Sequence, residues 1–203
     1  MAKIIKLSSP ETTRLGLKRV RKTKQKVAED HGQLNLFAPR PDGRVVKFSV
    51  NSAFEEALKF DEAGELESAR DTYIRAIKGG KRVADAYCNL GIIEFQLDQF
   101  IKAINCFTKA IQQAPRHFQA HYNLANLYSE QKNYDLARFH YQVAIEIAPE
   151  FPNAYYNLGL VLALDKEYQQ AIDALTKYKQ LASVEDIGNT DKLIEGLNHS
   201  LKN

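Results

Sequence analysis

Apolar and small residues recur along the chain with a constant spacing of 34 positions, so that residues 84–117 and 118–151 align as two copies of one pattern. Leu90 in the first copy corresponds to Leu124 in the second. The same spacing relates Ala103 to Ala137, Phe107 to Tyr141, Ala110 to Ala144 and Pro115 to Pro149. A fixed period of this length predicts a stacked array of structural repeats.

Within one copy, the apolar positions follow helical spacing. Tyr87, Leu90 and Phe107 are placed to fill the seam between two helices. The small residue Gly91 allows the two helices to approach closely, and Pro115 ends the second helix because proline cannot donate a backbone hydrogen bond. Each copy therefore predicts a helical hairpin, which needs stacked neighbours to bury its apolar face.

Two further copies extend the array: residues 50–83 align with the pattern weakly, and residues 152–185 form a good fourth copy. Ser52 followed by Glu55 reads as a capping box, which predicts that the first helix begins there. Residues 190–202 predict a final helix that covers the last repeat. The apolar face of this final helix is expected to consist of Leu193, Ile194, Leu197 and Leu201.

The repeat resembles the tetratricopeptide family. The matching positions of the first clear copy are Tyr87, Leu90, Gly91, Ala103, Phe107, Ala110 and Pro115. Glu94 departs from the pattern by standing where the family has tyrosine, and in the next copy His121 takes the first aromatic position. The resemblance implies an all-α fold, a right-handed superhelix of antiparallel helix pairs. The pattern of residues 190–202 adds a C-terminal capping helix, and the basic composition of the N-terminal stretch predicts a disordered arm.

The chain therefore divides into three parts. A basic arm over residues 1–49, expected to be largely disordered, precedes four repeats over 50–185, and a capping helix occupies 186–203. The repeats are expected at 50–83, which is divergent, and at 84–117, 118–151 and 152–185.

Charge is spread unevenly between these parts. Residues 1–50 hold twelve Lys or Arg against four Asp or Glu, and the stretch from Arg14 to Lys26 is the most basic. Such a run is a solubilising tail, a contact for nucleic acid or another anionic surface, or a nuclear address, and charge alone does not choose among these readings.

A short apolar segment follows the basic run. It consists of Gln33, Leu34, Asn35, Leu36 and Phe37. The segment resembles the motif by which bacterial proteins dock on the replication sliding clamp, although Asn35 departs from the usual serine or aspartate. An alternative is that Leu34, Leu36 and Phe37 pack on the repeats or in their groove. The first reading makes the protein an adaptor of the DNA machinery, with the basic arm touching nucleic acid.

No set of residues predicts catalysis, a cofactor or a metal site. His117 and His121 are four positions apart, but His117 falls in a turn and His121 in an aromatic core position, while His140 is expected on an outward position. Carboxylates are expected at turns and on outer faces, and no phosphate-binding glycine motif occurs. We therefore expect a protein that is not an enzyme.

Composition bounds the setting of the protein. Cys88 and Cys106 have no metal-ligand spacing and fit a reducing compartment. No apolar run approaches a membrane span, and the first ten residues lack a signal-peptide core. These features favour a cytoplasmic protein without a membrane span.

The resemblance implies that the first helices of the hairpins line a concave groove, where Gln96 is also placed. The peptide-binding residues expected there are Asn89, Phe95, Tyr122, Asn123, Asn126, Tyr156 and Asn157. Asn89, Asn123 and Asn157 stand 34 positions apart, and each amide could pair with a peptide group of an extended ligand. The alternative is that these asparagines cap or bridge neighbouring helices.

Affinity for such a ligand would come mainly from burial against the rings of Phe95, Tyr122 and Tyr156. The groove lacks the Lys and Arg clamp with which some relatives hold acidic tails, so it should favour a neutral or basic peptide. Residues 14–37 are a candidate to fold back into it. The sequence thus predicts a scaffold that binds another protein or peptide, with an accessory subunit of a separate enzyme as a further alternative.

Overall fold

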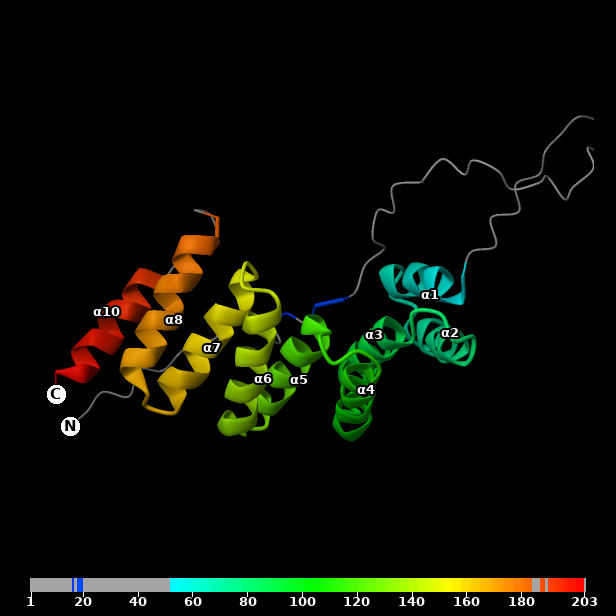
Figure 1. The fold of residues 1–203 in the computed structure, drawn as a ribbon, viewed down its shortest axis with the longest axis horizontal. Helices are drawn as coiled ribbons and strands as arrows, with labels where there is room; N and C mark the ends of the chain where they lie inside the picture. Colours follow the sequence, from blue (N-terminus) through cyan, green and yellow to red (C-terminus); the bar gives the residue numbers. More distant parts are fainter. Residues whose placement is uncertain (1–15, 17, 20–51, 184–186, 189, 203) are drawn as a thin grey trace, which may run out of the picture. The chain divides into compact units, whose positions relative to one another are not determined.

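The structure is a computed structural model that describes residue 16, residues 18–19, 52–183, 187–188 and 190–202 (Figure 1). Within these ranges every regular element is an α-helix, which confirms the all-α fold predicted from the repeat. The described chain forms two compact units. Residues 83–203, together with the N-terminal stretch that includes Lys18 and Arg19, form one unit, and residues 52–82 belong to the other.

The smaller unit contains one helical hairpin, α1 (Ala53–Glu62) and α2 (Leu66–Lys78). Helix α1 begins where the sequence predicts, because the Ser52 hydroxyl accepts a hydrogen bond from the Glu55 backbone N–H at 3.3 Å. Phe54 and Tyr73 pack edge to face across the hairpin, with ring centroids 5.8 Å apart. The guanidinium of Arg82 lies over the Phe54 ring, 4.0 Å from its centroid.

The larger unit stacks three helical hairpins and a final helix. Helices α3 and α4, α5 and α6, and α7 and α8 pack as pairs, and each pair contacts the next through α4 with α5 and α6 with α7. Their bounds are α3 (Val83–Gln96), α4 (Phe100–Gln113), α5 (Phe118–Glu130), α6 (Tyr134–Ile147), α7 (Pro152–Leu164), α8 (Tyr168–Leu181) and α10 (Thr190–Leu201).

Small residues bring the paired helices together, as the repeat pattern predicts. A Cβ atom built on Gly91 of α3 would lie 2.7 Å from the ring of Phe107 on α4. One built on Gly159 of α7 would lie 2.7 Å from Leu175 Cγ on α8. Phe107 and Leu175 are both fully buried, so these contacts form the centre of the seam in each hairpin.

The turn inside every hairpin has the same backbone conformation at positions 34 apart. Gly64, Asp98, Lys132 and Lys166 all have positive φ, from 58° to 76°. After each of them a backbone N–H reaches back to the first helix, in the bonds Glu65 to Phe60, Gln99 to Glu94, Asn133 to Tyr128 and Glu167 to Leu162. Three of the four positions are not glycine, so the residue types do not predict this shared turn. The conformation lets a backbone N–H satisfy a carbonyl oxygen at the end of the first helix.

The ends of the array agree with the sequence in most respects. Helices α4 and α6 end two residues before Pro115 and Pro149, at Gln113 and Ile147. The final helix α10 packs on α8 through Leu193, Ile194 and Leu197. Leu201, expected on the same face, is 45% exposed because α10 ends there. Among the helices of the described residues, none combines the length and apolar character that crossing a bilayer requires.

Candidate peptide-binding surface

Asn123, on α5, holds one residue of the N-terminal stretch by both of its backbone polar groups. The backbone N–H of Lys18 donates to Asn123 Oδ1 at 2.7 Å, and Asn123 Nδ2 donates to the Lys18 carbonyl oxygen at 3.0 Å. Asn123 itself is fully buried. The blue segment in Figure 1 is the N-terminal stretch that makes this contact.

Two further contacts flank this pair. The guanidinium of Arg19 donates to Oε1 of Gln96, near the end of α3, at 3.1 Å. The ammonium of Lys18 lies over the ring of Phe151, 5.3 Å from its centroid, at the start of α7. We call Gln96, Asn123 and Phe151 the Asn123 site; it draws one residue from the region of each of α3, α5 and α7.

The double hydrogen bond selects for backbone shape. In an extended chain the N–H and C=O of one residue point to the same side, whereas in a helix they point in opposite directions along the axis. A primary amide carries a donor and an acceptor side by side and can therefore pair with both groups of one extended residue. The arrangement at Asn123 is suited to holding an extended peptide whatever side chain it carries at that position.

Cys88, on α3, contacts the Asn123 amide nitrogen through its sulfur. Asn123 Nδ2 lies 3.5 Å from Cys88 Sγ, and burial raises the pKa of the Cys88 thiol well above its ordinary value. The thiol thus stays protonated near neutral pH. Cys88 and Cys106 are both free and buried, and neither is part of a disulfide.

Three other predicted groove residues form a buried network with each other. Asn157 Nδ2 donates to the Tyr122 hydroxyl and to Asn126 Oδ1, both at 3.0 Å. The hydroxyl of Tyr141 donates to the same Asn126 oxygen at 2.5 Å. Burial raises the pKa of Tyr122 to about 12 and that of Tyr141 well above its ordinary value, so both hydroxyls remain protonated. These amides bridge neighbouring helices, which is the alternative that the sequence left open.

The remaining predicted residues contribute differently. Asn89 and Phe95 are buried on α3, where Phe95 packs edge to face on Phe100 at 5.7 Å. Tyr156 is half-buried, and its ring lies 4.9 Å from that of Tyr178. Tyr122 is 1% exposed with the N-terminal stretch in place. Of the three rings expected to receive a ligand, only Tyr156 therefore retains appreciable exposed surface in this structure.

Phe151 was not predicted, because it lies one residue before the first helix of the last repeat rather than on it. Its ring packs edge to face on Tyr122 at 5.0 Å and on Phe118 at 5.5 Å. The sequence signal that could have found it is an aromatic residue directly before Pro152, at the N-cap of α7.

The prediction that His140 points outward is wrong. Its Nδ1 lies 3.0 Å from Nδ1 of His121, and its ring stacks on Tyr128 at 5.8 Å. His121 Nε2 lies 3.1 Å from the Pro115 carbonyl oxygen, which only accepts, so His121 carries its proton on Nε2 and accepts from His140 at Nδ1. Burial lowers the pKa of both rings, for His140 to about 4. A neighbouring histidine lowers each pKa further: His117 acts on His121, and His121 acts on His140.

We expect this pair to make stability depend on pH. A histidine whose pKa is lower in the folded than in the unfolded state leaves stability unchanged above about pH 6.5, and stability is lost as the pH falls from there toward the folded value near 4. The free energy of unfolding should therefore fall between pH 6.5 and 5 in the wild type. In His140→Gln, whose amide can still donate to His121, this fall should be smaller in urea titrations at each pH. Equal slopes in the two proteins would contradict the assignment.

His117 serves a local structural role. Its Nδ1 accepts the backbone N–H of Ala120 at 3.2 Å, which caps α5, and its Nε2 lies 3.0 Å from Asp85 Oδ1. The expectation that carboxylates lie at turns and outer faces is wrong for two residues, because Asp61 and Glu94 are buried. In the described part of the chain, His, Cys, Asp and Glu side chains do not gather in threes that could hold a metal ion.

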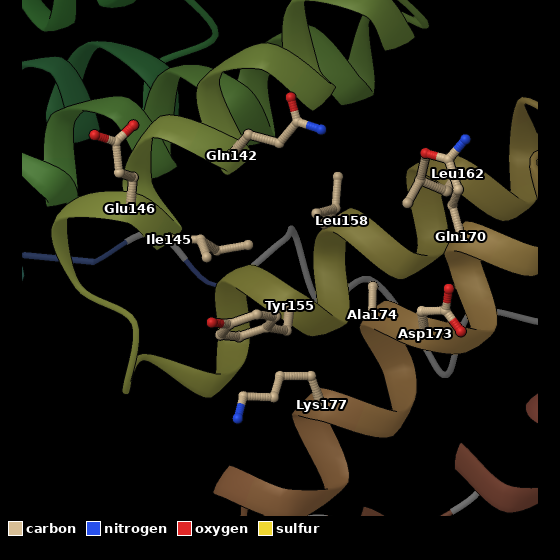
Figure 2. Close-up of a pocket in the computed structure, with 10 residues that line it drawn as sticks. All are labelled: Gln142, Ile145, Glu146, Tyr155, Leu158, Leu162, Gln170, Asp173, Ala174 and Lys177. Atoms are coloured by element: carbon tan, nitrogen blue, oxygen red, sulfur yellow. The ribbon is translucent and has the colours of Figure 1, made fainter.

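A separate open pocket of about 450 Å³ lies between α6, α7 and α8 (Figure 2). Its lining combines apolar side chains with Glu146, Asp173 and Lys177. Asn123 is not among the lining residues. Glu146 lies on α6, whereas Asp173 and Lys177 lie four positions apart on α8, where opposite charges at this spacing can pair with each other. The pocket therefore has no convergent set of polar groups that defines a ligand.

Several predictions lie outside the described residues. The structure does not describe the segment of Gln33, Leu34, Leu36 and Phe37. Of the residues from Arg14 to Lys26, it describes Gly16, Lys18 and Arg19. Clamp docking and nucleic-acid contact thus stay predictions.

Comparisons with known proteins agree with this architecture. Two family models described as tetratricopeptide repeat match residues 82–150 and 140–173. A comparison with curated proteins gives no match. Among solved structures, MamA from Desulfovibrio magneticus RS-1 is similar with a TM-score of 0.65 and 23% identity, covering 74% of this chain and 84% of that one.

Two other solved structures share the fold. TTC0263, a thermophilic TPR protein of Thermus thermophilus, has a TM-score of 0.57 at 18% identity and covers 73% of this chain and 81% of its own. The first TPR of Spaghetti (RPAP3), bound to the HSP90 peptide SRMEEVD, has a TM-score of 0.55 at 18% identity, with coverage of 59% and 94%. At these identities the similarity concerns the fold.

Proposed function

Residues 82–173 belong to the tetratricopeptide-repeat family, and on this premise we propose that the protein is a non-catalytic scaffold that binds an extended segment of another protein at the Asn123 site. The observation that carries the proposal is the pair of hydrogen bonds in which the Asn123 amide accepts from the N–H of Lys18 and donates to its C=O. A fold relative, RPAP3, is itself seen bound to a peptide, which supports the general mode.

The contacts at the site suit a reversible interaction. Two neutral hydrogen bonds contribute roughly 0.5–1.5 kcal/mol each, the bond from a charged guanidinium about 1.5–3 kcal/mol, and an ammonium over an exposed ring about 0.5–1 kcal/mol. Together these reach roughly the millimolar to micromolar range before the cost of ordering the peptide is subtracted. A partner that binds more tightly must therefore make contacts beyond those that Lys18 and Arg19 make.

The test is a selection of short random peptides, displayed on phage, against the full-length protein. Peptides selected on the wild type should bind Asn123→Ala about 5- to 150-fold more weakly by fluorescence anisotropy, because two hydrogen bonds are lost. Asn157→Ala is the matched control, because it removes the same side chain one repeat later but breaks bonds internal to the protein. Binding that is equal in the wild type and Asn123→Ala would refute the proposed site.

A further inference from the structure

The occupant seen at the Asn123 site points to the chemistry of the partner and to a regulation of the site. We propose, building on the function above, that the site recognises an extended basic segment with a Lys-Arg pair, and that Lys18 and Arg19 of this chain occupy it as an internal competitor. Both side chains of this pair contact the site: the Lys18 ammonium lies over the Phe151 ring, and the Arg19 guanidinium donates to Gln96.

Charge on the first helices of the larger unit favours a basic occupant. Helices α3, α5 and α7 contain no Lys or Arg, and their only charged side chains are Asp85, Glu94 and Glu130. A cationic segment therefore approaches helices that offer no repulsion, while an acidic tail would find no cation on them to pair with. Arg19 is half-buried at this position, where its guanidinium offers a planar set of donors.

Tethering makes a weak contact effective. A segment carried on the same chain as its site acts at an effective concentration on the order of millimolar. Before the cost of ordering is subtracted, the contacts of Lys18 and Arg19 correspond to the millimolar to micromolar range, so a local concentration on the order of millimolar lets the segment compete for the site. A partner peptide must then displace the internal segment. Its apparent affinity is reduced in proportion to the fraction of molecules in which the site is free.

The main contact of the internal segment can be removed by a single backbone change. Lys18→Pro deletes the N–H that donates to Asn123 Oδ1, as well as the ammonium over Phe151. Lys18→Ala deletes only the ammonium and keeps the N–H, so it is the matched control. Both substitutions leave every residue of the Asn123 site intact.

The experiment measures binding of a fluorescent peptide with the sequence of residues 14–26 to the full-length protein. We expect Lys18→Pro to bind this probe about tenfold more tightly than the wild type, and Lys18→Ala about two- to fivefold more tightly, because the competitor is weakened by one backbone hydrogen bond in addition to one cation–π contact. A probe in which each Lys and Arg is replaced by Glu should bind at least tenfold more weakly to Lys18→Pro than the basic probe.

Three outcomes would overturn the inference. Equal affinity of the wild type and Lys18→Pro would refute internal competition, and equal binding of the basic and acidic probes would refute the basic partner. Self-association of the wild type in sedimentation velocity that Lys18→Pro abolishes would show that the segment occupies a second copy instead of its own chain. The proposed function itself fails only if Asn123→Ala retains peptide affinity, so the two can be told apart.

Discussion

Replacing Phe107 by alanine is expected to lower the free energy of unfolding of the α3–α8 unit by about 3–5 kcal/mol. Phe107 is fully buried on α4, and its ring fills the space left by Gly91 on α3. Alanine would leave a cavity between α3 and α4, because Gly91 has no side chain that could fill the space of the missing ring. Urea unfolding followed by far-UV circular dichroism measures the loss.

The control is Phe139→Ala on α6. The Phe139 side chain is 55% exposed, so its truncation should change the free energy of unfolding by less than about 1 kcal/mol. A loss in Phe107→Ala no larger than that in Phe139→Ala would mean that the Gly91–Phe107 contact does not hold the hairpin together.

Replacing Asn126 by alanine is expected to cost about 2–3 kcal/mol of folding free energy. The Asn126 oxygen accepts from both Tyr141 and Asn157, and the variant leaves the buried Tyr141 hydroxyl and one Asn157 N–H without this acceptor. A buried donor that loses its partner costs about 1–3 kcal/mol. The loss is moderated because Asn126 Nδ2, which is buried without an acceptor among the described residues, disappears with the side chain.

Thermal and urea unfolding of Asn126→Ala and Asn198→Ala provide the measurement. Asn198 lies on α10 with an exposed side chain whose amide donates to the Ile194 carbonyl oxygen at 3.1 Å, so its removal should cost less than about 0.5 kcal/mol. If Asn126→Ala is as stable as Asn198→Ala, the buried network does not tie α5, α6 and α7 together. Tyr141→Phe should show part of the Asn126→Ala loss, because it removes one of the same bonds.

The hairpins could be predicted from the sequence because their packing depends on residue size. Gly91 and Phe107 fit each other by volume alone, and the spacing that relates one hairpin to the next repeats this fit. Helix ends at Gln113 and Ile147 followed from the prolines two residues later. Residue size and the position of proline can be read directly from the sequence, so these features of the fold were predictable.

The roles of the asparagines could not be predicted from their spacing. Asn123 and Asn157 occupy equivalent positions, yet Asn123 contacts Lys18 and Asn157 contacts Tyr122 and Asn126. The difference follows from hydroxyl groups on neighbouring helices, above all Tyr141, which stands where the preceding repeat has Phe107. That exchange of phenylalanine for tyrosine was the available signal, because a buried hydroxyl requires an acceptor.

His140 was misjudged for a related reason. Its environment is made by His121 and Tyr128 on the adjacent helix α5, and the pattern along α6 alone places it at the edge of the buried face. Contacts between polar groups on different helices depend on orientation, which spacing along one helix does not determine.

The left-handed conformation shared by Gly64, Asp98, Lys132 and Lys166 has a consequence for how this molecule tolerates changes in length. Each turn closes through a backbone bond that forms with glycine, aspartate or lysine at the left-handed position, so every hairpin contains its own complete turn. Whole hairpins can therefore be added or deleted as modules that rejoin at equivalent positions, whereas an insertion of a few residues inside a helix would rotate one half of its apolar stripe away from the seam.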